Sequence, residues 1–326
     1  MITFHDIQTA RERIKDLVIK TPLLTSDRLN DRLGFRLFVK AEPLQRIGAF
    51  KFRGACNALL QLPNEANQVI AFSSGNHAQA VALVARLTGR HATIIMPEDA
   101  PKAKIEATKS YGADVVLYDR YSESREEIGD RLTKERGAVL VKPYDDERVI
   151  CGQGTIGIEL AEQIAEQNIT PARLYCCAGG GGLIAGTSVA LHETHPDLPI
   201  YAAEPIEFDD ISRSLAKGHK VRNDPEARSI CDAIVTPEPG DITFPIMQEH
   251  LAGGVGISDD DCLRAMQTSW RYLKLVTEPG GAVGVAGALA HAGDAQWAGK
   301  DIIAIASGGN VDDGIFAQAL AIEGAI

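Results

Sequence analysis

Four short stretches of this chain carry residues that could act together in one chemical site. Lys51 lies within residues 48–55 and offers a primary amine, which becomes a nucleophile once burial or a nearby charge lowers its pKa. Glycine fills every position of 179–182, and small polar loops occupy 73–77 and 307–310. A reactive amine, a loop that can enclose an anion and two polar loops are what an aldehyde cofactor with a phosphate group requires.

The glycine run follows an apolar stretch, residues 174–178, and precedes a helical pattern over 183–192. Glycine lets the backbone approach a ligand closely, and the N–H groups at the start of a helix favour an anion. No Lys-Ser or Lys-Thr pair follows the run, so the sequence excludes a nucleotide P-loop. The run therefore predicts a phosphate site of another kind.

A dinucleotide site is an open alternative at this point. Gly180, Gly182 and Ala185 satisfy the G-x-G-x-x-A pattern. Glu204 lies about 20 residues further on, where an acid that binds the ribose would be placed. An NAD-dependent oxidoreductase, however, gives no role to Lys51 or to the serine-rich loops.

Short, often β-branched apolar runs alternate with stretches of helical periodicity. The predicted strands are 36–39, 69–72, 92–96, 114–117, 174–178, 200–203 and 302–306. The predicted helices are 55–62, 79–87, 102–111, 125–135, 155–167, 183–192 and 258–272. This alternation predicts an α/β fold whose parallel sheets are flanked by helices. Ser258, which precedes three aspartates, is a predicted helix N-cap.

The bulk composition limits the possible classes of protein. The chain has 326 residues, 45% of them hydrophobic and 24% charged, which favours a globular protein of two lobes. The net charge is −11 and no run of Lys or Arg is present, which argues against a nucleic-acid partner. No apolar stretch approaches the roughly 20 residues of a membrane span. The N-terminus lacks the apolar centre of a signal peptide, so we expect a cytoplasmic protein.

The six cysteines show no C-x-x-C spacing, which argues against a zinc site or a disulfide framework. The adjacent Cys176 and Cys177 fall within a predicted apolar strand. Free, buried thiols are therefore the expected state of this pair.

Several short motifs, in a fixed order, extend over nearly the whole chain. They are Lys40-Ala41-Glu42, Phe50-Lys51-Phe52-Arg53-Gly54-Ala55, Ser73-Ser74-Gly75-Asn76-His77, Met96-Pro97 with Ala100-Pro101, Gly152-Gln153-Gly154-Thr155, Gly179 to Gly182, Glu204-Pro205, Glu278-Pro279 and Ser307-Gly308-Gly309-Asn310. Together they resemble the motifs of fold-type II pyridoxal-phosphate (PLP) enzymes of the serine/threonine dehydratase and serine racemase group. The resemblance implies a two-lobed, tryptophan synthase β-like fold and a homodimer. We expect a large PLP-binding domain from residues 1–66 and 147–326, and a small domain from 67–146.

The same resemblance implies how the cofactor would be held. Lys51 matches the lysine that binds PLP covalently, and Phe50 matches the aromatic residue beside the pyridine ring. Asn76 matches the partner of the ring hydroxyl, and Ser307 the partner of the ring nitrogen. The phosphate loop is matched by Gly179, Gly180, Gly181 and Gly182.

Other positions match the family's substrate site. Ser73, Ser74 and His77 would receive the substrate carboxylate, and Ser74 also matches the base on the opposite face of the cofactor in serine racemases. Arg125 matches an arginine near the racemase substrate carboxylate, and Thr236 a nearby hydroxyl. Two alternatives stay open here. Ser73 and Ser74 could only cap a helix from residue 79, and Arg125 could belong to a solvated helix face.

A divalent cation is a further expectation from the resemblance. Its ligands would be the carboxylates of Glu204 and Asp210 and the backbone carbonyl of Phe208. Hard oxygen ligands of this kind suit Mg²⁺ or Ca²⁺. The alternative is an acidic, solvated loop without a metal.

Three departures from the family pattern concern the substrate pocket. Ala49 stands where the family usually has Ser, Ala233 follows Asp232 where it often has Gly, and Tyr144 stands where racemases often have Asn. The identity of the substrate therefore stays open.

The activity that the resemblance implies is that of a PLP-dependent ammonia-lyase. The substrate would be a β-hydroxy amino acid (serine, threonine or hydroxyaspartate), and Lys51 would remove its Cα proton. Loss of the β-hydroxyl and hydrolysis would then give a 2-oxo acid and ammonia. The alternative with the same cofactor is an amino-acid racemase of the serine type. Alternatives of other classes are an NAD-dependent oxidoreductase and a non-enzymatic amino-acid-binding protein, which would leave Lys51 unexplained.

Overall fold

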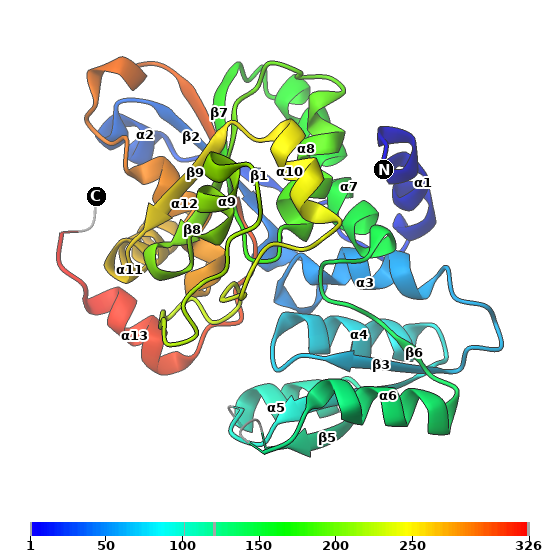
Figure 1. The fold of residues 1–326 in the computed structure, drawn as a ribbon. Helices are drawn as coiled ribbons and strands as arrows, with labels where there is room; N and C mark the ends of the chain where they lie inside the picture. Colours follow the sequence, from blue (N-terminus) through cyan, green and yellow to red (C-terminus); the bar gives the residue numbers. More distant parts are fainter. Residues whose placement is uncertain (1, 101, 120–121, 325–326) are drawn as a thin grey trace.

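The computed structural model describes residues 2–100, 102–119 and 122–324, which form two sheets flanked by helices (Figure 1). One sheet has six strands in the order β1-β2-β10-β7-β8-β9, and the other has four in the order β5-β4-β3-β6. All neighbouring strands are parallel except β1 and β2. The predicted α/β class with parallel sheets is therefore confirmed.

The strands of the six-stranded sheet are β1 (Leu23–Leu24), β2 (Arg36–Ala41), β7 (Pro171–Cys177), β8 (Ile200–Pro205), β9 (Gly253–Ile257) and β10 (Asp301–Ala306). Those of the four-stranded sheet are β3 (Gln68–Phe72), β4 (His91–Pro97), β5 (Asp114–Tyr118) and β6 (Val139–Leu140). Every residue of β10 is buried, as expected for a central strand of a parallel sheet whose two faces are covered.

The helices connect these strands and cover the sheets. They are α1 (Phe4–Ile14), α2 (Asp27–Leu33), α3 (Lys51–Leu59), α4 (Asn76–Leu87), α5 (Lys102–Ser110), α6 (Arg125–Arg136), α7 (Glu147–Glu166), α8 (Gly182–His192), α9 (Asp210–Lys217), α10 (Thr243–His250), α11 (Asp259–Thr268), α12 (Pro279–Leu289) and α13 (Asp313–Ala321). Ser258 caps α11, because its hydroxyl accepts a hydrogen bond from the backbone N–H of Asp261.

Several helix boundaries differ from the prediction, and α7 shows why. The sequence suggested a start at residue 155, whereas α7 begins at Glu147 and includes Gly152 and Gly154. A Cβ atom at Gly152 would lie 2.6 Å from the backbone oxygen of Arg53. Glycine at this position therefore allows α7 to pack closely on α3, and it does not end the helix.

The helix α3 lies between the two halves of the molecule (Figure 1). It packs against α7 on one side and against α4 on the other. Phe52 of α3 belongs to the same apolar cluster as Val69 of the four-stranded sheet and Val149 of α7. We propose residues 67–146 as the small domain because they contain the whole four-stranded sheet, with α3 shared by both cores.

Four buried charged side chains fix α3 against the large sheet. The Arg53 guanidinium donates to both oxygens of Glu42 at 2.9 and 2.8 Å, and to both oxygens of Glu159 at 2.7 and 2.9 Å. The Lys40 amine donates to Glu159 at 2.6 Å and to the backbone oxygen of Thr21 at 2.7 Å. Arg53, Lys40 and Glu42 are 0% exposed, so their charges are balanced within the protein and not by water.

We expect the Arg53→Met substitution to destabilise the fold by about 3–5 kcal/mol, because it leaves two carboxylates buried without their main partner. Urea unfolding followed by circular dichroism measures this loss. The control is Arg11→Met, which removes the half-exposed pair of Arg11 with Glu162 and should cost less than about 1 kcal/mol. An Arg53→Met protein as stable as the Arg11→Met protein would contradict this account of the network.

Candidate active site

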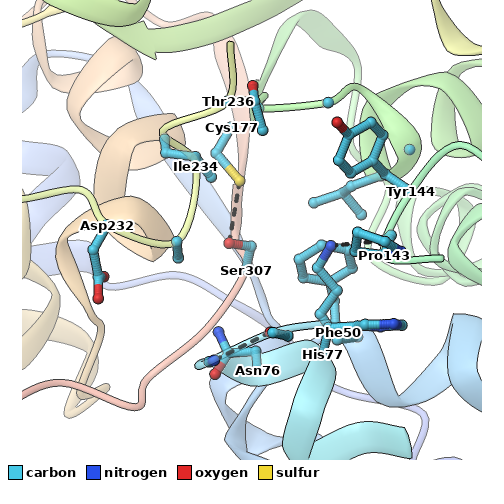
Figure 2. A pocket seen from close by; sticks show the side chains of 18 of the residues that line it. Phe50, Asn76, His77, Pro143, Tyr144, Cys177, Asp232, Ile234, Thr236 and Ser307 are labelled. Atoms are coloured by element: carbon cyan, nitrogen blue, oxygen red, sulfur yellow. Dashed lines mark hydrogen bonds between the residues drawn. The ribbon is translucent and has the colours of Figure 1, made fainter. Parts of the chain in front are cut away.

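A cavity of about 260 Å³ lies between the two sheets, beside the first residues of α3, α4 and α8 (Figure 2). Its wall contains every residue that the sequence assigned to the cofactor or to the substrate. These are Phe50, Lys51, Ser73, Ser74, Asn76, His77, Arg125, Gly179, Gly180, Gly181, Gly182, Thr236 and Ser307. The structure thus brings together segments that are far apart in the sequence, although their individual roles stay predictions.

Lys51 is the first residue of α3, and its amine donates to the backbone oxygen of Pro143 at 2.8 Å. Burial lowers the pKa of Lys51 to about 8. The neutral, nucleophilic amine is therefore more populated near neutral pH than in an exposed lysine. The amine also lies 5.1 Å from the centre of the Phe50 ring.

Hydrogen bonds to the segment after β10 hold the start of α3 in place. The backbone N–H of Phe50 donates to the oxygen of Ser307 at 3.0 Å, and Ala49 forms a β-bridge with Gly308. Lys51 and Ser307 therefore face the same cavity from segments that are directly bonded to each other. This is the arrangement required for one ligand to contact both side chains.

The glycine loop follows β7 and leads directly into α8, as the sequence predicted. A Cβ atom at Gly180 would lie 2.2 Å from the Tyr144 ring, so a larger residue would not fit there. The hydroxyl of Thr243 donates to the Gly180 oxygen at 2.6 Å and fixes the loop. The positive end of the α8 dipole and its unpaired N–H groups suit a phosphate at this position.

The dinucleotide alternative requires Glu204 to face the same ligand, and the structure does not support it. Glu204 is 0% exposed and does not line the cavity. One carboxylate oxygen accepts from the N–H of Ile211, and the other accepts from the N–H and hydroxyl of Ser212. The side chain is thus committed to the start of α9.

The loop from Ser73 to His77 also lines the cavity. Helix α4 begins at Asn76 with Gly75 at its N-cap and no side-chain cap, so the alternative that the two serines cap a helix from residue 79 is wrong. Ser73 accepts from the N–H of Gly75 at 3.1 Å. Ser74 lines the cavity, and the positive end of α4 favours a carboxylate beside it.

His77 is buried, and the ring nitrogen Nε2 lies 2.9 Å from the oxygen of Val141. Burial and the nearby charge of Lys51 lower the pKa of His77 to about 3. The ring is therefore neutral at physiological pH. Because a carbonyl can only accept, Nε2 carries the proton in this arrangement, and Nδ1 is left as an acceptor.

Among the wall residues to which the sequence assigned no role, four carry an acidic, basic or thiol side chain: Cys177, Glu278, Lys104 and Asp232. Glu278 accepts from the amide of Asn76 at 2.6 Å, and burial raises its pKa to about 7. Lys104 of α5 forms an ion pair with Asp232, which lies in the loop between α9 and α10. The motif Glu278-Pro279 was visible in the sequence, but nothing in it placed residue 278 beside residue 76.

Arg125 and Thr236 reach the cavity from two different segments. Arg125 is the first residue of α6, and Thr236 lies in the loop between α9 and α10. The hydroxyl of Thr236 is buried without a hydrogen-bond partner in the protein, so its polar atom is available to a ligand (Figure 2).

The three predicted metal ligands do not line the cavity. Burial raises the pKa of Glu204 to about 8 and that of Asp210 to about 7. One oxygen of Asp210 accepts from Asn223 at 2.6 Å, and the other is buried without a partner. Phe208 lies in the short helical turn between them. In the described part of the chain, no three His, Cys, Asp or Glu side chains form a metal cluster, so a cation here would depend on the Phe208 carbonyl and on water.

Known proteins resemble this chain over nearly its whole length. A family model described as "Pyridoxal-phosphate dependent enzyme" matches residues 14–308. The L-threo-3-hydroxyaspartate ammonia-lyase of Saccharomyces cerevisiae is 44% identical, over 95% of this chain and 94% of that protein. The serine racemase of Schizosaccharomyces pombe is 41% identical, over 95% and 94% of the two chains. The crystal structure of a serine racemase from Dictyostelium discoideum superposes with a TM-score of 0.87 at 36% identity, over 95% and 99%. That of a threonine deaminase superposes with a TM-score of 0.89 at 38% identity, over the same shares of the two chains.

Proposed function

This chain belongs to the family of pyridoxal-phosphate dependent enzymes and is an ammonia-lyase of the serine/threonine dehydratase type; we propose that its substrate is a β-hydroxy amino acid with a second carboxylate. A substrate of the 3-hydroxyaspartate class has this chemistry. Among the described residues, no helix is both long and apolar enough to span a membrane.

The residues of the cavity fit PLP. The buried Lys51 amine, the closely packed glycine loop at the start of α8 and the Ser307 hydroxyl lie in one wall. When bound, PLP withdraws electrons from the substrate Cα. The chain itself would hold the phosphate at Gly179 to Gly182, the ring hydroxyl at Asn76 and the ring nitrogen at Ser307. Phe50 would lie beside the ring.

The remaining residues would bind the substrate and move its protons. The N–H groups at the start of α4, with Ser73, Ser74 and His77, would hold the α-carboxylate. Lys51 would take the proton from Cα, because its amine has a lowered pKa and lies in the cavity wall. The β-hydroxyl then leaves, and hydrolysis of the dehydrated product gives the 2-oxo acid and ammonia.

One observation carries the choice of a dicarboxylic substrate. The cavity wall contains two basic side chains besides Lys51, namely Lys104 and Arg125. Both come from the proposed small domain. The α-carboxylate would be held at the start of α4, so a second carboxylate on the substrate is the group that these two basic side chains would bind. A β-carboxylate could pair with them. The amine of Lys104 is paired with the carboxylate of Asp232 at the cavity wall. The amine can therefore bind a carboxylate at this position.

Racemisation is the second candidate activity, because Ser74 lies in the cavity wall and carries a hydroxyl that can exchange a proton. A base on each face of the substrate is what inversion at Cα requires. Proteins named serine racemase are among the relatives of this chain. Both activities could use Lys51 on one face, with Ser74 needed only for inversion.

We also propose a divalent cation, Mg²⁺ or Ca²⁺, at Glu204, Phe208 and Asp210. The support is the unpartnered, buried oxygen of Asp210 and the proximity of a second buried carboxylate whose pKa the Asp210 charge helps to raise. A bound cation would stabilise the charged form of both carboxylates, whose pKa values burial raises. The site lies at the start of α9 and would stabilise the connection of β8 to that helix.

We expect kcat/KM for release of ammonia and 2-oxo acid to be higher with L-threo-3-hydroxyaspartate than with L-serine or L-threonine. Lys104→Met and Arg125→Ala should each raise KM for hydroxyaspartate by about tenfold or more and leave KM for serine little changed, because a charge-assisted hydrogen bond contributes about 1.5–3 kcal/mol. Coupled assays of ammonia and 2-oxo acid measure these constants.

The control for this experiment is Lys109→Met, which removes an exposed lysine of the same helix α5 that is paired with Glu106. Lys51→Ala should abolish turnover of all three substrates. Efficient turnover of serine with none of hydroxyaspartate would overturn the substrate class alone. Absence of any product from all three amino acids would overturn the lyase activity itself.

Ser74→Ala should suppress racemisation of L-serine by roughly a hundredfold or more, because positioned acid–base groups contribute about 10²–10⁴ in rate. Elimination from the L-isomer should change little. Chiral chromatography of the amino acid and the 2-oxo acid assay measure the two rates in one sample. For comparison, Ser73→Ala in the same loop removes a proposed contact of the α-carboxylate and should lower both rates together. Equal loss of both activities in Ser74→Ala would refute the division of roles.

Addition of Mg²⁺ or Ca²⁺ to chelator-treated holoenzyme should raise Tm by a few degrees, because a ligand at 100 times its Kd adds about 2.7 kcal/mol. Differential scanning fluorimetry measures this shift. Asp210→Asn should remove it. Asp209→Asn, which changes a partly exposed carboxylate paired with Arg213, should not. If neither Mg²⁺ nor Ca²⁺ changes the Tm of the wild-type protein, the site is excluded.

A further inference from the structure

The thiol of Cys177 forms a hydrogen bond with the residue that faces the predicted ring nitrogen. Its Sγ lies 3.1 Å from the Oγ of Ser307, as the dashed line in Figure 2 shows. Cys177 is the last residue of β7, and Ser307 directly follows β10, the neighbouring strand. The two residues are 3% and 4% exposed, and both line the cavity.

The direction of this hydrogen bond decides what Ser307 can offer to a ligand. A serine hydroxyl has one proton to donate and lone pairs with which to accept. The positions of the two atoms fit the thiol as donor and the serine oxygen as acceptor. Among the residues that the structure describes, no other side chain bonds to this hydroxyl, so its own proton is left to point into the cavity.

We propose that Cys177 is a positioning residue that keeps the Ser307 hydroxyl as a donor to the pyridine nitrogen of PLP. This inference rests on the proposed binding of PLP and adds a residue to it. A nitrogen that accepts a hydrogen bond from serine carries no proton of its own. The opposite arrangement, in which Ser307 donates to the sulfur, would offer a lone pair to the nitrogen and favour its protonation.

The consequence concerns the course of the reaction. A pyridine ring without a proton on its nitrogen withdraws electrons less strongly than a pyridinium ring. The electron pair left at Cα is then less delocalised into the ring, which favours prompt departure of the β-hydroxyl. Cys177 would thus support elimination without touching the substrate.

The chain offers a matched control in the preceding residue. Cys176 is on the same strand and fully buried, but its thiol lies 3.4 Å from the backbone oxygen of Cys177 and does not line the cavity. Successive side chains of a strand point to opposite faces of the sheet. A change at Cys176 therefore tests the packing of β7 without removing the thiol that contacts Ser307.

The experiment compares wild type, Cys177→Ala, Cys177→Ser and Cys176→Ala, each reconstituted with ¹⁵N-labelled PLP. The ¹⁵N chemical shift of the ring reports protonation of its nitrogen, and fluorescence titration of the apoprotein gives the Kd for PLP. We expect Cys177→Ala to move the ¹⁵N shift and to weaken PLP binding by about two- to tenfold, the range of one hydrogen bond. Cys177→Ser keeps a donor and should restore both values, and Cys176→Ala should match wild type.

Three results would overturn the inference: a Cys177→Ala protein with the wild-type ¹⁵N shift and Kd, an equal change in Cys176→Ala, or no recovery in Cys177→Ser. If Cys177→Ala fails to fold, the comparison of Cys177→Ser with Cys176→Ala still decides, because a wild-type ¹⁵N shift in the serine variant supports the donor role and a pyridinium shift opposes it. A wild-type protein that binds no PLP would instead overturn the proposed function, and the inference with it.

Discussion

The position of the reactive amine depends on a buried set of four charges, Lys40, Glu42, Arg53 and Glu159. Residues two apart on a helix point about 200° apart, so Arg53 and Lys51 lie on nearly opposite faces of α3. Once Arg53 is bonded to both carboxylates, the rotation of α3 is fixed and Lys51 must face the cavity. The charges balance within the set, and loss of one member would leave an unpaired charge in the core.

Burial then divides the cavity into two electrostatic regions. In the inner region, the pKa of Lys51 is lowered to about 8, that of His77 is lowered to about 3, and that of Glu278 is raised to about 7. These groups can exchange protons near neutral pH or stay uncharged. The wall that the proposed small domain supplies carries two basic side chains, Lys104 and Arg125. The inner region therefore suits proton transfer, and the outer wall suits selection of an anionic substrate.

The sequence predicted the seven longer strands and the glycine loop because those segments carry local signals, buried apolar runs and a unique composition. It missed β1, β6 and β9, since two of these have only two residues and the third, Gly253–Ile257, is rich in glycine. It placed the start of α7 eight residues late because Gly152 serves helix packing. The contacts of Cys177 and Lys104 could not be predicted, because they join positions more than a hundred residues apart.

Asn76 belongs to the small-domain helix α4, but its amide is held by the large domain. Its nitrogen donates to Glu278 at 2.6 Å, and its oxygen accepts from Asn310 at 2.7 Å. These hydrogen bonds fix Asn76 to the same proposed domain as the other predicted cofactor contacts. Lys104 and Arg125 lie on other elements, α5 and α6, which these hydrogen bonds do not involve. Changes in α5 and α6 can therefore alter the β-substituent that is accepted without moving the cofactor wall. This separation gives a physical reason why relatives of similar identity are named for different amino acids, hydroxyaspartate and serine.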